Sequence, residues 1–289
     1  MLLNDGVTPR PSARRFPLRF LFYVCVMSDF PPDSSVVERV VPSPNHSERQ
    51  GFARADMIVL HYTGMASGDA ALQRLCDPEA KVSSHYLVYE NGSIVQLVPE
   101  ARRAQHAGVS SWEGVTDINS RSIGIEIVNP GHDFNYPEFP RRQIAAVTTL
   151  CRSILTRNPI RRDRVVAHSD VAPSRKQDPG EKFPWRLLSE SGVGLWVEPE
   201  PISDWLSLIP GDTGDTVAEL QTALASYGYG VPVTREYDDV TKDVVKAFQR
   251  HFRPAQIDGM ADSSTRETLR RLLEARDKLS PPADRPTTS

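Results

Sequence analysis

A short proline-punctuated segment, Glu198-Pro199-Glu200-Pro201, divides the chain into two parts with different hydrophobic patterns. From about residue 36 to 195, strand-like and helix-like stretches alternate, whereas the pattern from 204 to 275 is helical throughout. Because prolines stiffen a polar segment, we interpret residues 196–203 as a linker between two domains. The length of 289 residues also favours two domains over one.

The first part contains three stretches with the pattern of β-strands. Residues 57–60 and 165–167 are short apolar runs, as expected of strands that are buried on both faces. Residues 122–128 alternate, so that the isoleucines at 123, 125 and 127 share one face and Glu126 points to the other. We therefore expect these strands to form a central sheet.

A predicted hairpin and a predicted helix complete this part. Two β-rich runs, 85–89 and 93–98, flank Asn91-Gly92, which favours a hairpin with a type I′ turn. Between residues 141 and 157, apolar side chains recur at helical spacing, and Cys151 belongs to this core-facing stripe. Together these elements predict an α/β (α+β) fold with a mixed central sheet flanked by helices.

The second part predicts a small domain of three helices. Glycines end each helical stretch, and aspartates or threonines begin the next. Leu220-Gln221 and Phe248-Gln249 occupy matching places, which suggests two related halves. We expect residues 276–289 to be a disordered tail. A helical dimerisation domain is an alternative interpretation, and a DNA-reading helix-turn-helix is disfavoured because basic residues are not concentrated on one helix.

Charge and cysteine content exclude several classes of protein. The net charge of −3 and the pI of about 6.2 lack the basic excess of a dedicated nucleic-acid binder. Three widely separated cysteines without a Cys-x-x-Cys motif argue against a disulfide framework and a cysteine-built metal site.

The first 35 residues form an N-terminal extension with two interpretations. Arginines precede a short apolar run, residues 20–27, which resembles a weak export or anchor signal. That run is too short to span a bilayer, so we expect no integral membrane span. Alternatively, Met27 is the true start of the protein. The first interpretation predicts an exported or anchored protein, and the second a cytoplasmic one.

Two histidines stand where predicted strands end beside polar loops. His61 follows the run 57–60, His168 follows 165–167, and Asp178 comes ten residues after His168. Two imidazoles and one carboxylate, with a fourth position left for water, are the ligand set of a catalytic zinc. The spacing alone also allows each residue to be an ordinary hydrogen-bonded side chain.

Four collinear motifs within residues 36–190 together carry a specific family resemblance. The motifs are His61-Tyr62-Thr63, Ser84 to Val88, Ile123 to Asn129, and His168 to Pro173 continuing through Arg175-Lys176 and Asp178-Pro179-Gly180. With these motifs the chain resembles the zinc-dependent N-acetylmuramoyl-L-alanine amidases of bacteria, the AmpD/AmiD type, whose fold is shared with peptidoglycan recognition proteins. The C-terminal helices resemble the peptidoglycan-binding module found beside many wall hydrolases.

The resemblance implies a function and assigns roles to residues. One Zn²⁺ ion would be held by His61, His168 and Asp178. Glu126 would be the general base that takes a proton from the attacking water and returns it to the leaving amine. Lys176 would stabilise the developing oxyanion. The bond cleaved would be the amide between N-acetylmuramic acid and L-alanine in peptidoglycan or muropeptides.

Further residues are weaker candidates for substrate contact. His85 precedes a hairpin strand, where it would line the cleft or support the site from behind. Trp112 and Asn119, together with His106, lie in a long polar loop before the strand that carries Glu126, and Arg175 lies in the loop that carries Lys176. We interpret the remaining histidines, His46, His132 and His251, as surface residues.

Two alternatives to the amidase remain open from the sequence. A non-catalytic peptidoglycan-binding protein could use the same scaffold, although it would be expected to lack a zinc ligand. A zinc hydrolase acting on another amide is a more distant alternative. For the amidase we expect a monomer whose partner is peptidoglycan or its muropeptides and not nucleic acid.

Overall fold

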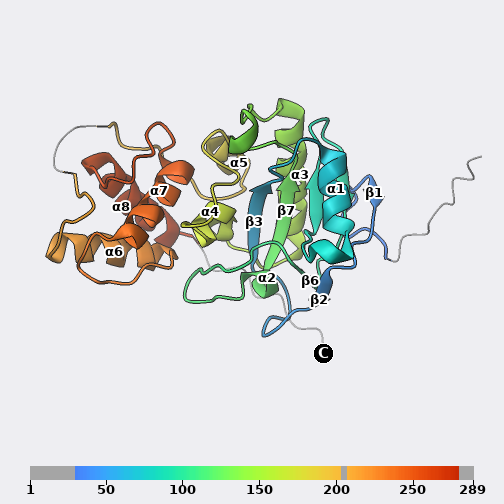
Figure 1. Cartoon of the computed structure of the whole chain (residues 1–289), viewed down its shortest axis with the longest axis horizontal. Coiled ribbons are helices and arrows are strands. Elements are labelled where there is room, and N and C mark those ends of the chain that lie inside the picture. Colours follow the sequence, from blue (N-terminus) through green and yellow to red (C-terminus); the bar gives the residue numbers. More distant parts are fainter. Residues whose placement is uncertain (1–29, 203–206, 280–289) are drawn as a thin grey trace, which may run out of the picture.

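A mixed sheet with flanking helices joins a group of C-terminal helices in the computed structural model, which describes residues 30–202 and 207–279 (Figure 1). The strands are β1 (Arg39–Val40), β2 (His46–Glu48), β3 (Met57–Tyr62), β4 (Tyr86–Val88), β5 (Ile94–Gln96), β6 (Arg102–Ala104), β7 (Ser122–Ile127) and β8 (Val165–Ala167). The α-helices are α1 (Gly68–Cys76), α2 (Ile118–Arg121), α3 (Arg141–Arg157), α4 (His168–Val171), α5 (Trp185–Glu190), α6 (Asp215–Tyr227), α7 (Asp239–Phe252) and α8 (Ser263–Asp277).

The central sheet has six strands in the order β1-β5-β4-β7-β3-β8. Strands β4 and β5 are antiparallel, and every other neighbouring pair in this sheet is parallel. The predicted mixed sheet is therefore confirmed. A separate antiparallel pair, β2 and β6, lies beside it. Because β3, β7 and β8 run in the same direction, the segments that follow them emerge at one edge of the sheet.

The two faces of the sheet are covered by different parts of the chain. One face carries the isoleucines of β7 and packs on helix α3, which spans the predicted residues 141–157. On the other face, α1 packs over β4 and β5. Met57 and Val59 of β3 also lie on this second face and share one apolar cluster with the C-terminal helices. Because side chains alternate along a strand, His61 and Glu126 also project from this second face. They lie on the part of it between α1 and the C-terminal helices.

The β4–β5 hairpin forms as predicted, but its turn is of a different type. Tyr89 pairs with Ser93, and the Gly92 N–H donates to the carbonyl of Tyr89, so the loop has three residues rather than two. Gly92 has a φ of +90°, whereas Asn91 stays at negative φ and its side chain accepts a bond from the Ser93 N–H. The predicted type I′ turn is wrong because a three-residue loop requires positive φ at one position only.

The three predicted C-terminal helices are α6, α7 and α8. The repeated glutamines make equivalent hydrogen bonds in the two halves. The side-chain amide of Gln221 donates to Thr241, and that of Gln249 donates to Thr265. Each threonine lies in the first turn of the next helix, three residues after an aspartate cap. Each glutamine oxygen accepts a backbone N–H from the intervening loop. The two halves of the module are therefore related, as the sequence suggests.

The ends of the chain lie largely outside the described residues. Within the predicted extension 1–35, Asp33 is already attached to the sheet, since its N–H donates to the side-chain oxygen of Gln96 in β5. Residues 1–29, with the export-signal and start-site interpretations, are not described. Helix α8 continues to Asp277, so the first two residues of the predicted tail are helical, and 280–289 lie outside the described part. No helix within the described ranges is long and apolar enough to cross a membrane.

The C-terminal helices share a core with the sheet. Val166 of β8 and Val171 of α4 belong to the same apolar cluster as Leu220 and Phe248 of the helices. The predicted linker takes part, because Trp196 packs on this cluster and the Glu200 backbone bonds the side chains of two residues in α8. The two parts that differ in sequence pattern thus meet through one shared apolar cluster. Helices α4 and α7 lie side by side at this junction (Figure 1).

Candidate metal centre

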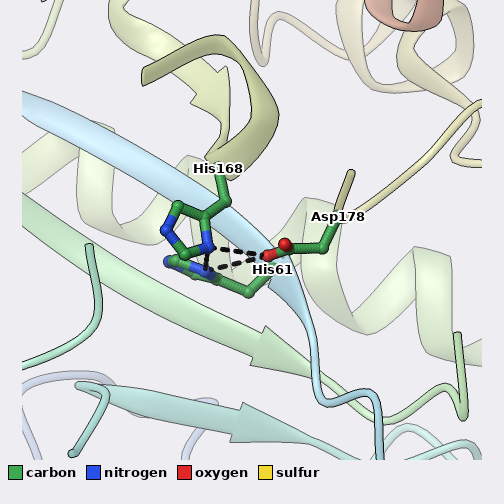
Figure 2. Close-up of side chains that lie close together, drawn as sticks. All are labelled: His61, His168 and Asp178. Atoms are coloured by element: carbon green, nitrogen blue, oxygen red, sulfur yellow. Dashed lines mark hydrogen bonds and ion pairs between the residues drawn. The ribbon is translucent and has the colours of Figure 1, made fainter. Parts of the chain in front are cut away.

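His61, His168 and Asp178 converge at the edge of the sheet where β3 and β8 end (Figure 2). His61 lies near the end of β3, and His168 begins α4 directly after β8. The two Nδ1 atoms are 2.9 Å apart, and Asp178 Oδ2 is 3.2 Å from that of His61 and 3.0 Å from that of His168. Three ligand atoms from separate segments therefore face one another.

The outer nitrogen of His168 has its own partner, which fixes the orientation of the ring. Its Nε2 lies 3.1 Å from the carbonyl oxygen of Ala107. A carbonyl can only accept, so Nε2 carries the proton and Nδ1 presents its lone pair to the other two ligands. This is the arrangement that second-sphere partners impose on metal-bound histidines.

The outer nitrogen of His61 is fixed by a longer chain of hydrogen bonds. The Ser122 hydroxyl donates to the Ile118 carbonyl, so its oxygen is left to accept from Nε2 of His106. Nδ1 of His106 then accepts from Nε2 of His61 at 3.0 Å. The direction of donation along this chain leaves Nδ1 of His61 unprotonated, as metal binding requires.

The electrostatic surroundings of His61 and Asp178 suit a cation. Burial, aided by the neighbouring His168, lowers the pKa of His61 to about 4, which keeps its imidazole neutral. Burial opposes ionisation of Asp178, but its interactions with His168 and His61 outweigh burial and hold its pKa below the usual range. Two imidazoles and a carboxylate match the donor set of a catalytic zinc site, so the residues present fit this metal.

Glu126 lies next to His61 because the two are register partners on the parallel strands β7 and β3. It lines a cavity of about 420 Å³ that also exposes the three metal-site residues. Burial, with Asp178 nearby, raises the pKa of Glu126 well above its ordinary value, and Lys176 opposes this shift. A carboxyl group with a raised pKa beside a metal site suits proton transfer near neutral pH.

The loop that carries Asp178 brings two further predicted residues to the same cavity. Lys176 and Arg175 both line it. The guanidinium of Arg175 donates to the carbonyls of Ala107 and Val109 at the rim, which ties this loop to the one that supports His168. The N–H of Ser169 donates to the Asp178 carbonyl and so joins the two ligand-bearing segments directly.

Asn119, a predicted substrate contact, supports the site from behind instead of lining the cavity. Its side-chain oxygen accepts the N–H groups of His106 and Ala107. The His106 ring and the Ala107 carbonyl are the partners of the two metal-site histidines. Asn119 therefore holds the segment on which both imidazoles rest.

His85 and Trp112 are also absent from the lining of this cavity. His85 is fully buried, where it accepts the N–H of Gly124 and bonds the Arg102 carbonyl, so of its two predicted roles the structure favours support from behind. Trp112 is 1% exposed and packs edge-on against Tyr229 of the C-terminal part. The sequence could not show this, because Trp112 and Tyr229 are far apart along the chain.

One of the histidines interpreted as a surface residue is deeply buried. His251 of α7 is 2% exposed, and its Nδ1 lies 2.6 Å from Asp170, so the surface interpretation is wrong. His132 is half-buried and bonds Tyr62, whereas His46 is exposed. The sequence placed His106 among loop residues and missed its contact with His61. A glycine inside a strand often marks the close approach of another group, and Gly124 is such a position. In the structure a Cβ there would lie 2.5 Å from the His106 ring.

Two family models match the two parts of the chain. Residues 51–181 match the N-acetylmuramoyl-L-alanine amidase family, and residues 213–269 match a peptidoglycan binding domain family. The first range contains the whole metal centre, with Glu126 and Lys176. The second contains α6, α7 and the beginning of α8, up to Leu269.

Curated relatives cover much of the chain. The N-acetylmuramoyl-L-alanine amidase AmiD of Escherichia coli K12 is 39% identical over 239 residues, which cover 77% of this chain and 84% of the relative. The 1,6-anhydro-N-acetylmuramyl-L-alanine amidase AmpD of Salmonella typhimurium is 36% identical over 168 residues, covering 52% of this chain and 87% of that protein.

Solved structures agree with these relatives. E. coli AmiD in complex with the substrate anhydro-N-acetylmuramic acid-L-Ala-D-γ-Glu-L-Lys is 37% identical and superposes with a TM-score of 0.65, covering 80% of this chain and 97% of the other. AmpDh3 of Pseudomonas aeruginosa is 32% identical with a TM-score of 0.65, covering 81% and 97%.

Proposed function

The chain belongs to the N-acetylmuramoyl-L-alanine amidase family, and we propose that a zinc ion held by His61, His168 and Asp178 serves its reaction. The observation that carries the metal proposal is the convergence of three ligand atoms whose protonation states are set by their neighbours. The protein is an enzyme that hydrolyses the amide bond between N-acetylmuramic acid and L-alanine in peptidoglycan or muropeptides.

The side chains around the cavity divide the chemical work. Zinc, when bound, would act as a Lewis acid that polarises the scissile carbonyl and makes water acidic enough to lose a proton near neutral pH. We assign Glu126 the role of taking that proton and returning it to the leaving amine. Lys176 faces the same cavity, and its ammonium would stabilise negative charge that develops on the carbonyl oxygen. Arg175 at the rim is our candidate for contact with the substrate.

The C-terminal helices support peptidoglycan, the wall polymer, as a partner of the enzyme. Their match to a peptidoglycan binding domain family supports a two-domain arrangement, with the amidase domain at about 36–195, a linker at 196–203 and the binding module at 204–275. A module that holds the enzyme on the wall raises the local concentration of substrate. This arrangement favours the cell envelope, the periplasm, as the place of action, and we expect the protein to act as a monomer.

The test is to incubate purified, zinc-loaded protein with muropeptides and measure released stem peptide by mass spectrometry, with and without a chelator. We expect release that stops on chelation and returns with added zinc. Zinc-loaded protein that releases no stem peptide would contradict the proposal. Release that persists in Asp178→Ala at the rate of the wild type would contradict the metal-site assignment, because this variant lacks one of the three ligands.

A further inference from the structure

Asp170 is a completely buried side chain that links the metal centre to the C-terminal helices. It lies on α4, two residues after the metal-site residue His168, and is 0% exposed. Its Oδ1 accepts the hydroxyl of Tyr229 at 2.7 Å, and its Oδ2 accepts Nδ1 of His251 at 2.6 Å. Both donors belong to the C-terminal part of the chain, Tyr229 just after α6 and His251 within α7.

The same carboxyl group closes the turn from which His168 projects. Oδ2 of Asp170 also accepts the N–H of Ala167, the residue before His168, at 2.8 Å. This bond holds the start of the turn, and the bond from the Ser169 N–H to the Asp178 carbonyl joins the turn to the segment that carries Asp178. Because a side chain leaves the backbone in a direction set by its own φ and ψ, the geometry of this turn decides where the imidazole of His168 points.

The two donors are themselves held rigidly. The ring of Tyr229 packs edge-on against Trp112, and the imidazole of His251 stacks on Trp185 with their centroids 3.8 Å apart. Within the described residues, the bond to Asp170 is the one hydrogen bond that the His251 ring makes, since its Nε2 is buried without a partner. The ring is thus placed for this contact and no other polar one.

We propose that Tyr229 and His251 are positioning residues for the amidase reaction, because they hold Asp170 and through it the turn that carries His168. The helical module then has a second role, since it completes the support of the metal centre in addition to binding the polymer. This inference rests on the proposed function, because it takes His168 as a metal ligand. It implies that the module affects hydrolysis of small muropeptides, for which attachment to the wall polymer is irrelevant.

The first comparison uses two buried tyrosines of the module that each lose one hydroxyl. Tyr229→Phe removes the bond to Asp170, and Tyr237→Phe removes a bond of the same kind to the Gly259 carbonyl, wholly inside the module. In the full-length protein, zinc affinity is measured by competition with a chromophoric chelator, and kcat and KM on a small soluble muropeptide. We expect Tyr229→Phe to lower zinc affinity and kcat about tenfold, with KM unchanged, and Tyr237→Phe to match the wild type in all three.

The second comparison separates hydrogen bonding by His251 from its packing. His251→Asn and His251→Leu both lose the stack on Trp185, but the asparagine amide offers an N–H near the position of Nδ1. We expect His251→Asn to retain zinc affinity and kcat better than His251→Leu. Thermal unfolding of each variant, measured with and without zinc, reports the loss of packing that the two share.

The possible results separate the positioning role from a purely structural contact and from failure of the proposed function. If Tyr229→Phe lowers the unfolding temperature but leaves zinc affinity and kcat equal to those of Tyr237→Phe, the contact only joins the domains and the positioning proposal is overturned. Equal losses in His251→Asn and His251→Leu would also overturn it. If the wild-type protein itself neither binds zinc nor releases stem peptide, the proposed function fails, whatever the variants show.

Discussion

His61 and Glu126 are register partners on the neighbouring parallel strands β3 and β7. Adjacent strands lie about 4.8 Å apart, and paired residues point to the same face. The sheet therefore places the proposed base beside the metal site, so the spacing between them depends on the regular backbone hydrogen bonds of the sheet rather than on a flexible loop. Such a placement keeps a proton acceptor and a metal site at fixed separation throughout the reaction.

Glu126→Gln should slow turnover severely while leaving the metal in place. Glutamine has nearly the shape of glutamate but cannot take up the proton of the attacking water. We expect kcat to fall by about 10³-fold, within the range usual for loss of a general base. Zinc content, measured by atomic absorption on the purified variant, should equal that of the wild type because Glu126 is not one of the three converging ligands.

Lys176→Met should lower kcat with little effect on zinc affinity. Its ammonium faces the cavity beside Asp178 and is our candidate for stabilising the negative charge of the transition state. Loss of such a group costs about 3 kcal/mol, which corresponds to about 10²-fold in kcat. Lys176→Arg, which keeps the positive charge, should recover part of the rate. Equal activity of Lys176→Met and the wild type would remove this residue from the mechanism.

The sequence could predict the parts of this molecule that depend on local pattern. Helix α3 has the predicted bounds because its apolar stripe is regular, and the isoleucines of β7 share one face as the alternation requires. The positions of His61 and His168 at one edge of the sheet could also be predicted, since both follow apolar runs that become adjacent parallel strands. Their grouping with Asp178 as metal ligands is what the family resemblance implies, and the spacing does not show it.

The features that the sequence could not predict depend on contacts between distant segments. In the sequence, His251 has the pattern of an exposed helical residue. It is buried only because the fold packs Asp170 and Trp185 against it. Likewise, the role of His106 follows from the close approach of its ring to Gly124 in the neighbouring strand. No periodicity records either contact, because each is set by how the sheet packs against its loops and the C-terminal helices.

Gly124→Ala should displace His106 and thereby weaken the metal centre. A Cβ at this position would lie 2.5 Å from Cγ of the His106 ring, so the ring must move and lose its bond to His61. Overpacking of this kind costs about 1–3 kcal/mol of unfolding free energy. Zinc affinity should fall about tenfold, as for loss of a second-sphere partner. Both are measurable by urea unfolding and chelator competition.

Ser122→Ala is the control for this prediction. It removes the acceptor for Nε2 of His106 but adds no atom near the ring. The ring can therefore stay against His61, and we expect a smaller loss of zinc affinity than in Gly124→Ala. If the two variants lose affinity equally, the close approach of Gly124 to His106 has no special importance.

The stability of the metal-free protein should fall in acid, and His85 should account for a distinct part of the fall. Burial, with Arg49 nearby, lowers the pKa of His85 from 6.5 to about 3. Its Nδ1 accepts the Gly124 N–H, which is possible only while that nitrogen is unprotonated. The unfolded chain therefore binds more protons than the folded one at pH values between about 3 and 6.5.

The sign of the effect follows from this difference. The contribution of His85 is complete above pH 6.5 and is lost as the pH falls toward 3. At about 1.4 kcal/mol per pH unit, lowering the pH from 6.5 to 4.5 should cost roughly 2–3 kcal/mol through this residue. In His85→Asn, whose side-chain oxygen can still accept the Gly124 N–H, urea unfolding should show a correspondingly shallower pH dependence. Equal slopes for the variant and the wild type would show that His85 does not titrate on unfolding.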